Sequence, residues 1–382
     1  MEIAITVLLL IVGLVLIIKG GDFFVDAASW MAEASGIPKL IVGATVVSFA
    51  TTLPELLVSI FAALDARAAE ALSPGSGIGM VDMSIGNAIG SVTANLGLIM
   101  GIALVAIPMA IRRKDYMLKM ILMLVAAAVT VCFSLFDNGV GMVASILLII
   151  IFVIAMYDNI HEAVVAVKGG AKGQQLDEPV TKKAVITNVV KFLIGAVGTV
   201  AGAQLLVDNG SALASMCGVS DRVISVTIIA IGTSLPELVT TLTAIAKKQG
   251  SLSAGNIIGA NIIDLTLILP VCALIYGSKL PASPTVAMVD IPACLIIGIL
   301  SVVPTLITKK FSRWQGALML AAYAVYIILS VIVMAELVTF VTKAPFSRKT
   351  GLFYALFKSF PLDFSALCML KCNRSVTNVI AL

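Results

Sequence analysis

Two short stretches place a proline and a carboxylate together inside strongly apolar sequence. They read FATTLPELLV at 49–58 and IGTSLPELVT at 231–240. A proline donates no backbone hydrogen bond, so a carbonyl one turn earlier loses its helical partner. Each glutamate also has a threonine four positions before it, on the same face of a helix. These pairs are Thr51 with Glu55 and Thr233 with Glu237. Each stretch therefore offers carboxylate, hydroxyl and carbonyl oxygens, which together suit a cation.

A second pair of segments adds further oxygen ligands. IGNAIGSVTANL at 85–96 is similar to AGNIIGANIIDL at 254–265. Four positions separate Ser91 from Asn95, and Asp264 follows Ala260 by the same spacing. Carboxylates, amides and hydroxyls are hard ligands that suit Ca²⁺ or Na⁺ better than Zn²⁺ or Cu⁺. Mg²⁺ fits less well because it keeps its water. The sequence thus predicts a site for a hard cation such as Ca²⁺ or Na⁺, and no cofactor is expected.

The composition indicates that these acids lie in a membrane. Of the 382 residues, 60% are hydrophobic and 12% are charged, whereas about 25% are charged in soluble proteins. Apolar runs of about 20 residues recur along the chain, and each can cross a bilayer as a helix. We therefore expect an all-α polytopic protein in contact with the lipid bilayer. The net charge of +4 reflects loop charges and does not indicate nucleic-acid binding.

Ten transmembrane helices are expected in two blocks of five. The predicted domains are a first repeat at 1–157, a cytoplasmic linker at 158–183, a second repeat at 184–342 and a tail of unknown structure at 343–382. The predicted spans are 3–34, 38–63, 83–109, 116–135, 140–157, 184–217, 221–246, 253–276, 287–307 and 315–340. The longer first-half connection, ARAAEALSPGSGIGM at 66–80, is expected to be a solvated loop.

The two blocks match in spacing as well as in text. Glu55 and Glu237 are 182 positions apart, and the Gly-Asn segments are 169 apart, with the difference falling in the longer first-half loop. Five spans per copy make the second copy enter the membrane from the opposite side. We therefore expect two inverted repeats, with the cation site where they meet.

Loop charges predict the orientation. Basic residues follow the third, fifth, seventh and ninth spans, and acidic residues dominate the loops between them. Basic loops face the cytoplasm. We therefore expect a multi-pass protein of the plasma or inner membrane, with its N-terminus outside and the central linker cytoplasmic.

At these residues the sequence resembles the cation/calcium exchanger superfamily, especially its sodium/calcium exchanger branch. The resemblance covers about 1–342 and rests on ATTLPEL, IGTSLPEL, GNAIGSVTAN and GNIIGANIID. It implies ten spans, two inverted five-helix repeats and sodium-driven calcium antiport by alternating access. It also implies a ligand set, which includes the carbonyls of Ser48 and Ala230. The set is Ser48, Thr51, Thr52, Glu55, Ser91, Asn95, Ala230, Thr233, Ser234, Glu237 and Asp264.

Two other coupling ions stay open. Proton-coupled relatives usually carry a glutamate where this chain has Gly90 and Gly259, which disfavours proton coupling. Potassium-dependent relatives resemble this chain in having an aspartate at position 264. The alternative to sodium is therefore a proton- or potassium-coupled calcium antiporter.

An enzyme is not expected. An intramembrane hydrolase needs an activated nucleophile or a metal with an open position. The single histidine, His161, falls in a charged loop, and no Ser-His arrangement or HExxH motif is present. A purely structural membrane protein would leave the repeated acids unexplained.

Overall fold

The computed structural model describes residues 2–106, 113–168, 180–216, 232, 234–283, 286–308 and 310–343. The chain divides into two units, Met1–Val333 and Met334–Leu382, and the first contains every feature discussed below. Ala230, Thr233 and the predicted tail beyond Lys343 lie outside the described residues.

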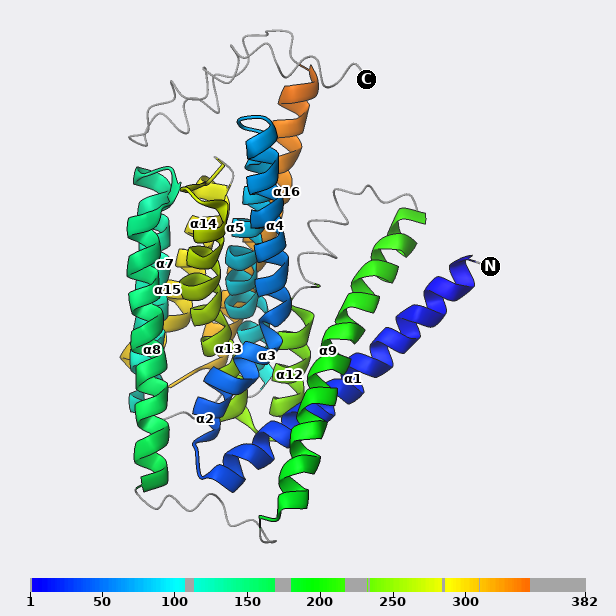
Figure 1. Cartoon of the computed structure of the whole chain (residues 1–382), viewed down its shortest axis with the longest axis vertical. Coiled ribbons are helices and arrows are strands. Elements are labelled where there is room, and N and C mark those ends of the chain that lie inside the picture. The colour runs from blue at the N-terminus through cyan, green and yellow to red at the C-terminus, as the bar shows by residue number, and fades with distance from the viewer. Residues whose placement is uncertain are drawn as a thin grey trace. The chain divides into compact units, whose positions relative to one another are not determined.

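The described part of the chain is almost entirely helical (Figure 1). The first half contains α1 (Glu2–Ser35), α2 (Lys39–Val42), η1 (Gly43–Val47), α3 (Ser48–Thr51), α4 (Leu53–Leu72), α5 (Ile78–Ala94), η2 (Asn95–Met100), α6 (Gly101–Ala106), α7 (Arg113–Phe136) and α8 (Met142–Lys168). The second half contains α9 (Lys182–Met216), α12 (Leu235–Ala246), α13 (Gly250–Ile263), η4 (Asp264–Ile268), α14 (Leu269–Tyr276), η5 (Val286–Asp290), α15 (Ile291–Thr308) and α16 (Arg313–Lys343). The η segments are π-helical turns.

Seven helices of the described residues are long and apolar enough to cross a membrane, and the bent pair of 39–51 and 53–72 makes eight. The protein is therefore a multi-pass helical membrane protein. Ten spans were predicted, which is more than the eight found among the described residues. The seventh predicted span, 221–246, lies partly outside the described residues, and the tenth coincides with α16.

Two predicted boundaries were wrong. The predicted loop at 66–80 is reduced to 73–77, because α4 continues to Leu72 and α5 begins at Ile78. Alanine favours helix over loop, and four of the seven residues from 66 to 72 are alanine. Helix α8 likewise continues past 157 to Lys168, so His161 lies on a helix, where its ring stacks on Tyr157.

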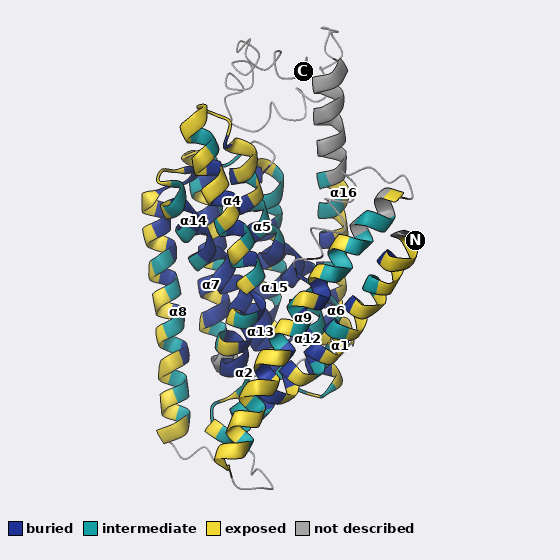
Figure 2. Cartoon of the chain, turned by 45° about the vertical axis from the view of Figure 1, so that its right-hand side comes forward, coloured by how far each residue is buried: buried dark blue, intermediate teal, exposed yellow. Residues whose placement is uncertain are grey.

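The helices form a central group and a peripheral pair. α5, α7, α13, α14 and α15 contribute to one large hydrophobic core, and they are the buried helices of Figure 2. α1 and α9 pack along each other and are mostly exposed. A separate, smaller cluster joins this pair to the central group through residues such as Phe24, Phe192 and Leu252.

A small sheet connects the two halves. β1 (Gly139–Val140) pairs antiparallel with β2 (Leu280–Pro281), so that Gly139 lies opposite Pro281 and Val140 opposite Leu280. The Lys279 ammonium lies 2.6 Å from Asp137 Oδ1 beside it. This connection fixes the α7–α8 turn against the turn that follows α14.

Candidate cation-binding site

The first candidate element is the break between α3 and α4. α3 ends at Thr51, α4 begins at Leu53, and the two segments are bent by 45°. Pro54 occupies the first turn of α4, where its missing N–H costs no helical hydrogen bond. The sequence therefore ends one helix and starts another in mid-span, and Glu55 lies in the new first turn. The positive end of the α4 dipole is directed toward this carboxylate.

The start of α12 in the second half resembles the start of α4. α12 begins at Leu235 with Pro236 in its first turn, and Glu237 follows directly. The side chains of Ser234 and Glu237 are buried. The predicted ligands Ala230 and Thr233 precede this helix and lie outside the described residues.

Three acids are buried near the starts of α4 and α12. Glu55, Glu237 and Asp264 are each 1% exposed. Glu237 lies on α12, which packs on α13, and Asp264 begins η4, which contacts α4, where Glu55 lies. None of their six carboxylate oxygens has a hydrogen-bond partner among the described residues. Such a group is costly to bury unless a positive charge neutralises it.

Several neutral oxygens of the predicted ligand set are in the same unsatisfied state. Four predicted ligands carry a buried side-chain oxygen without a hydrogen-bond partner in the described part of the chain. They are Thr52 Oγ1, Ser91 Oγ, Asn95 Oδ1 and Ser234 Oγ. Buried polar atoms in native proteins are nearly always paired, so a cluster of unpaired ones indicates a ligand. The seven residues are all oxygen donors, which fits a hard cation.

Two predicted ligands, Thr51 and Ser48, already form hydrogen bonds within the protein. The Thr51 hydroxyl faces Glu237 but donates to Asn256 Oδ1 at 3.2 Å and to the Ser48 carbonyl at 3.3 Å. The Ser48 carbonyl also accepts from the Thr52 N–H at 2.8 Å. Within the described ranges, no three histidine, cysteine or acidic side chains are arranged to hold a metal by themselves. Any cation bound here would need the neutral oxygens as well.

The π-helical turns mark the same positions in both halves. Asn95 is the first residue of η2, and Asp264 is the first residue of η4. A π-turn inside an α-helix is rare and is frequently associated with function. The sequence spacing predicts that Ser91 and Asn95 share a face, but it gives no signal for the wide turn that follows.

Two asparagines support the site without being predicted as ligands. Asn87 Nδ2 donates to the Glu55 carbonyl at 3.0 Å and to Ser59 Oγ at 2.9 Å. Asn256 Nδ2 donates to Thr240 Oγ1 at 3.2 Å, while its Oδ1 accepts from Thr51. Asn256 therefore connects the break in the first half to α12 in the second. Asn87 and Asn256 occupy equivalent places in the two Gly-Asn segments, and this equivalence is the feature of the sequence that could have identified them.

Asn261 is a further residue that sequence reasoning missed. Its side chain is 0% exposed, and neither its Oδ1 nor its Nδ2 has a partner among the described residues. It lies on α13, one turn before Asp264.

Replacing Asn256 by alanine is expected to weaken calcium binding rather than unfold the protein. The change leaves the Thr51 and Thr240 hydroxyls without their shared partner, and losing one buried hydrogen bond costs about 1–3 kcal/mol. We expect roughly a tenfold rise in the calcium concentration for half-maximal uptake, because 1.4 kcal/mol is a factor of ten. Asn209→Ala is the control, because Asn209 Nδ2 bonds only the Leu205 carbonyl of its own helix among the described residues. Equal half-maximal concentrations for both variants would contradict the role of Asn256.

Comparison with known proteins agrees with this geometry. The family model for the sodium/calcium exchanger protein matches residues 5–160 and 187–332. An uncharacterised membrane protein of Methanocaldococcus jannaschii is 31% identical over 322 residues, which are 83% of this chain and 95% of that protein. The sodium/calcium exchanger MaX1 of Methanosarcina acetivorans is 28% identical over 369 residues, covering 85% of this chain and 98% of its own length.

A solved structure has the same fold. The sodium-calcium exchanger NCX_Mj, soaked with 10 mM Na⁺ and zero Ca²⁺, superposes with a TM-score of 0.69 at 29% identity, over 85% of this chain and 99% of its own. Fold and sequence thus define a multi-pass membrane protein of the ion-antiport class. The chain belongs to the sodium/calcium exchanger family.

Proposed function

We propose that the protein is a sodium/calcium antiporter that works by alternating access. Family membership and fold support cation/calcium antiport. The observation that supports sodium and calcium as the ions is the group of unpaired, buried oxygens around Glu55, Glu237 and Asp264. One divalent cation or several monovalent cations would neutralise these acids, and exchange between those two states is antiport.

The ligand set proposed for the ions is the one predicted from the sequence. Glu55 and Glu237 would flank a calcium ion, and Asp264, Asn95, Ser91 and the hydroxyls near the two helix breaks would complete its shell. Thr233 and the Ala230 carbonyl are included in the proposed ligand set only because they are equivalent in the sequence repeat to Thr51 and the Ser48 carbonyl. Ten spans in two inverted repeats, an outside N-terminus and a cytoplasmic linker belong to the same proposal.

Calcium uptake into vesicles tests the proposal. Vesicles loaded with sodium and diluted into sodium-free medium with calcium are expected to accumulate calcium, because outward sodium flow drives its entry. Vesicles with equal sodium on both sides should not. A Glu237→Gln protein should show no driven uptake above empty vesicles, since it lacks one flanking carboxylate. Undiminished uptake by this variant would refute the proposed site.

Proton or potassium coupling is the second candidate, and Asp264 is the observation that favours it. A third buried carboxylate beside Glu237 adds negative charge that an additional cation or proton would neutralise. The same vesicles decide between the candidates when sodium, potassium and pH gradients are imposed one at a time. Uptake that is driven by a potassium or pH gradient without sodium would show that potassium or protons, and not sodium, are the coupling ion.

A further inference from the structure

The helix that contains Asn95 has two glycines on one face. Gly97 lies in η2, and Gly101 begins α6 four positions later. Glycines at this spacing allow two membrane helices to approach closely. A Cβ at Gly97 would lie 2.7 Å from Tyr323 Cβ, and a Cβ at Gly101 would lie 2.8 Å from Leu320 Cγ. Both partners belong to α16, so α16 packs directly against the backbone of η2 and α6.

α16 contributes a matching face to this contact. Gly316, Leu320 and Tyr323 are four and three positions apart, so they share one face of the helix. A Cβ at Gly316 would lie 2.7 Å from the Gly101 carbonyl oxygen. Tyr323 is 7% exposed. The contact is therefore close for both helices, and Tyr323 is the largest side chain of the three on α16.

A proline in α15 connects α16 to the same region. Pro304 lies inside α15 and has no N–H, so the Leu300 carbonyl loses its helical donor. Gln315 Nε2 of α16 lies 3.1 Å from that carbonyl oxygen and 2.6 Å from the Ser301 carbonyl oxygen. Gln315 Oε1 accepts from Thr305 Oγ1 at 3.1 Å. One side chain of α16 therefore replaces the hydrogen bond that the proline removes.

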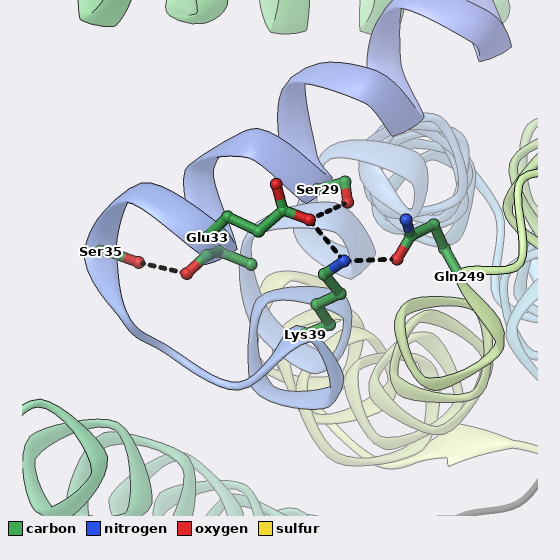
Figure 3. A network of polar contacts seen from close by, with 6 residues as sticks. Ser29, Glu33, Ser35, Lys39 and Gln249 are labelled. Carbon is green, nitrogen blue, oxygen red and sulfur yellow. Dashed lines mark hydrogen bonds and ion pairs between the residues drawn. The ribbon is translucent and has the colours of Figure 1, made fainter. Parts of the chain in front are cut away.

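The bonds of Gln315 differ from polar contacts nearer the surface. Lys39 joins Glu33 of α1 to Gln249 of the turn between α12 and α13 (Figure 3), and the Lys39 side chain is 18% exposed. Water can replace such bonds when they break, and exposed ion pairs contribute little to stability. Gln315 is 0% exposed, and a buried carbonyl that loses its donor stays unsatisfied. The start of α16 is therefore held to α15 by bonds that are costly to break.

α16 is bonded to the same span again three turns later. Tyr326 OH donates to Asp290 Oδ1 at 3.1 Å. Asp290 is the last residue of η5 and directly precedes α15. α16 is thus fixed to the span of η5 and α15 on both sides of the residues that contact η2. We call the part of α16 from Gln315 to Tyr326 the brace.

The brace lies against the segment from which Asn95 projects. Asn95 is the first residue of η2, and Gly97 follows it by two positions. At the other end of η2, Met100 Sδ lies 3.5 Å from Ser301 Oγ of α15. Asn95 is 1% exposed, and its Oδ1 has no partner among the described residues. The position of this oxygen therefore depends on where the backbone of η2 is held.

The equivalent residues in the second half are not glycines. The repeat offset of 169 places Thr266 at the position of Gly97 and Pro270 at the position of Gly101. Both residues carry side chains that keep a neighbouring helix at a greater distance. The close glycine contact is therefore a feature of the half that contains Asn95.

We propose that the brace positions Asn95 for ion binding, with Tyr323 and Gln315 as positioning residues. The proposal rests on the proposed function, because it takes Asn95 as an ion ligand. Tyr323 packs on Gly97 and thereby fixes the backbone that carries the Asn95 oxygen. Gln315 holds the brace in place by bonding the carbonyl that Pro304 leaves free.

Equilibrium binding of radioactive calcium to the purified protein in sodium-free detergent tests the proposal without transport. Tyr323→Ala is expected to raise the calcium Kd about tenfold, the lower end of the range for residues that orient a metal ligand. Tyr323→Phe keeps the ring on Gly97 and should bind as the parent does. The control is Tyr157→Ala, because Tyr157 is 69% exposed and stacks on His161. Its Kd should equal that of the parent.

A double-mutant cycle separates positioning from general packing. Asn95→Ala removes the ligand oxygen, so adding Tyr323→Ala to this variant should not raise the Kd further. A role in packing alone would give the same fold-change with and without the Asn95 side chain. That result would overturn the proposal, and so would a Tyr323→Ala protein with the Kd of the parent.

The proline provides a second test if Tyr323→Ala is poorly folded. Gln315→Leu leaves the Leu300 carbonyl without a donor, so we expect a lower melting temperature and weaker calcium binding. Adding Pro304→Ala restores the missing N–H and should recover both. Unchanged calcium binding in Gln315→Leu, in a parent that binds calcium, would refute the brace alone. A parent that binds no calcium would refute the proposed function and the brace with it.

Discussion

Calcium is expected to raise the melting temperature of the purified protein, and replacing Glu55 or Glu237 by glutamine should remove most of that rise. A ligand that binds only the folded state at 100 times its Kd adds about 2.7 kcal/mol of stability. The acids supply the charge that attracts calcium, and their oxygens have no other partner among the described residues. Thermal unfolding in detergent, with calcium or with chelator, measures the effect independently of transport.

The same substitutions should have the opposite effect without calcium. Burying three carboxyl groups without hydrogen-bond partners among the described residues is costly, and glutamine removes one ionisable group while keeping its shape. We therefore expect the cation-free variants to melt at the same temperature as the parent or higher. Glu70→Gln is the control, because within the described residues Glu70 accepts only the Gly75 N–H in an exposed turn. A variant that is destabilised in chelator and still responds to calcium would show that these acids are structural.

Gly259→Ala is expected to destabilise the protein and to weaken its calcium response. α13 packs closely on the segment before the first helix break, and a Cβ at Gly259 would lie 2.6 Å from the Ala44 Cα and carbonyl oxygen. Ser48 Oγ is nearer still. Overpacking of this kind costs about 1–3 kcal/mol. It also separates Asn256 and Asp264 on one side from Thr51 on the other, so calcium-induced stabilisation should fall with it.

Gly298→Ala provides the matched comparison. Gly298 lies within α15, and its added Cβ would be 3.6 Å from Leu124 Cδ1, an ordinary contact. Alanine is preferred to glycine in a helix by roughly 0.5–1 kcal/mol, so this variant should be as stable as the parent or more stable. If both glycine variants melt at the same temperature, the close contact at Gly259 does not affect the stability of the protein.

The apolar pattern and the Pro-Glu pairs of the sequence were enough to predict much of the architecture. They predicted a helical membrane protein, a break near each proline and buried acids at Glu55 and Glu237. The break at Pro54 follows from a local rule, because proline lacks the N–H that a helix interior needs, although Pro304 lies within α15 without ending it. The ten spans, the inverted repeats and the ligand roles are still predictions.

Other features depend on contacts that a local pattern does not contain. The alanine-rich segment after Ala66 was expected to be loop because the extra residues of the first half fall there, yet α4 continues to Leu72. The bond between Thr51 and Asn256 joins residues 205 positions apart. The ion pairs of Lys247 with Asp22 and Asp26 likewise depend on where α1 lies against α12, and the spacing of the two aspartates alone names no partner.

The wide turns at Asn95 and Asp264 interrupt the regular spacing of the helices that contain them. A π-turn closes its hydrogen bond over five residues instead of four. Side chains before and after the turn therefore do not continue a single α-helical face, and the direction of a side chain beyond Asn95 or Asp264 differs from the one that a continuous α-helix would give it.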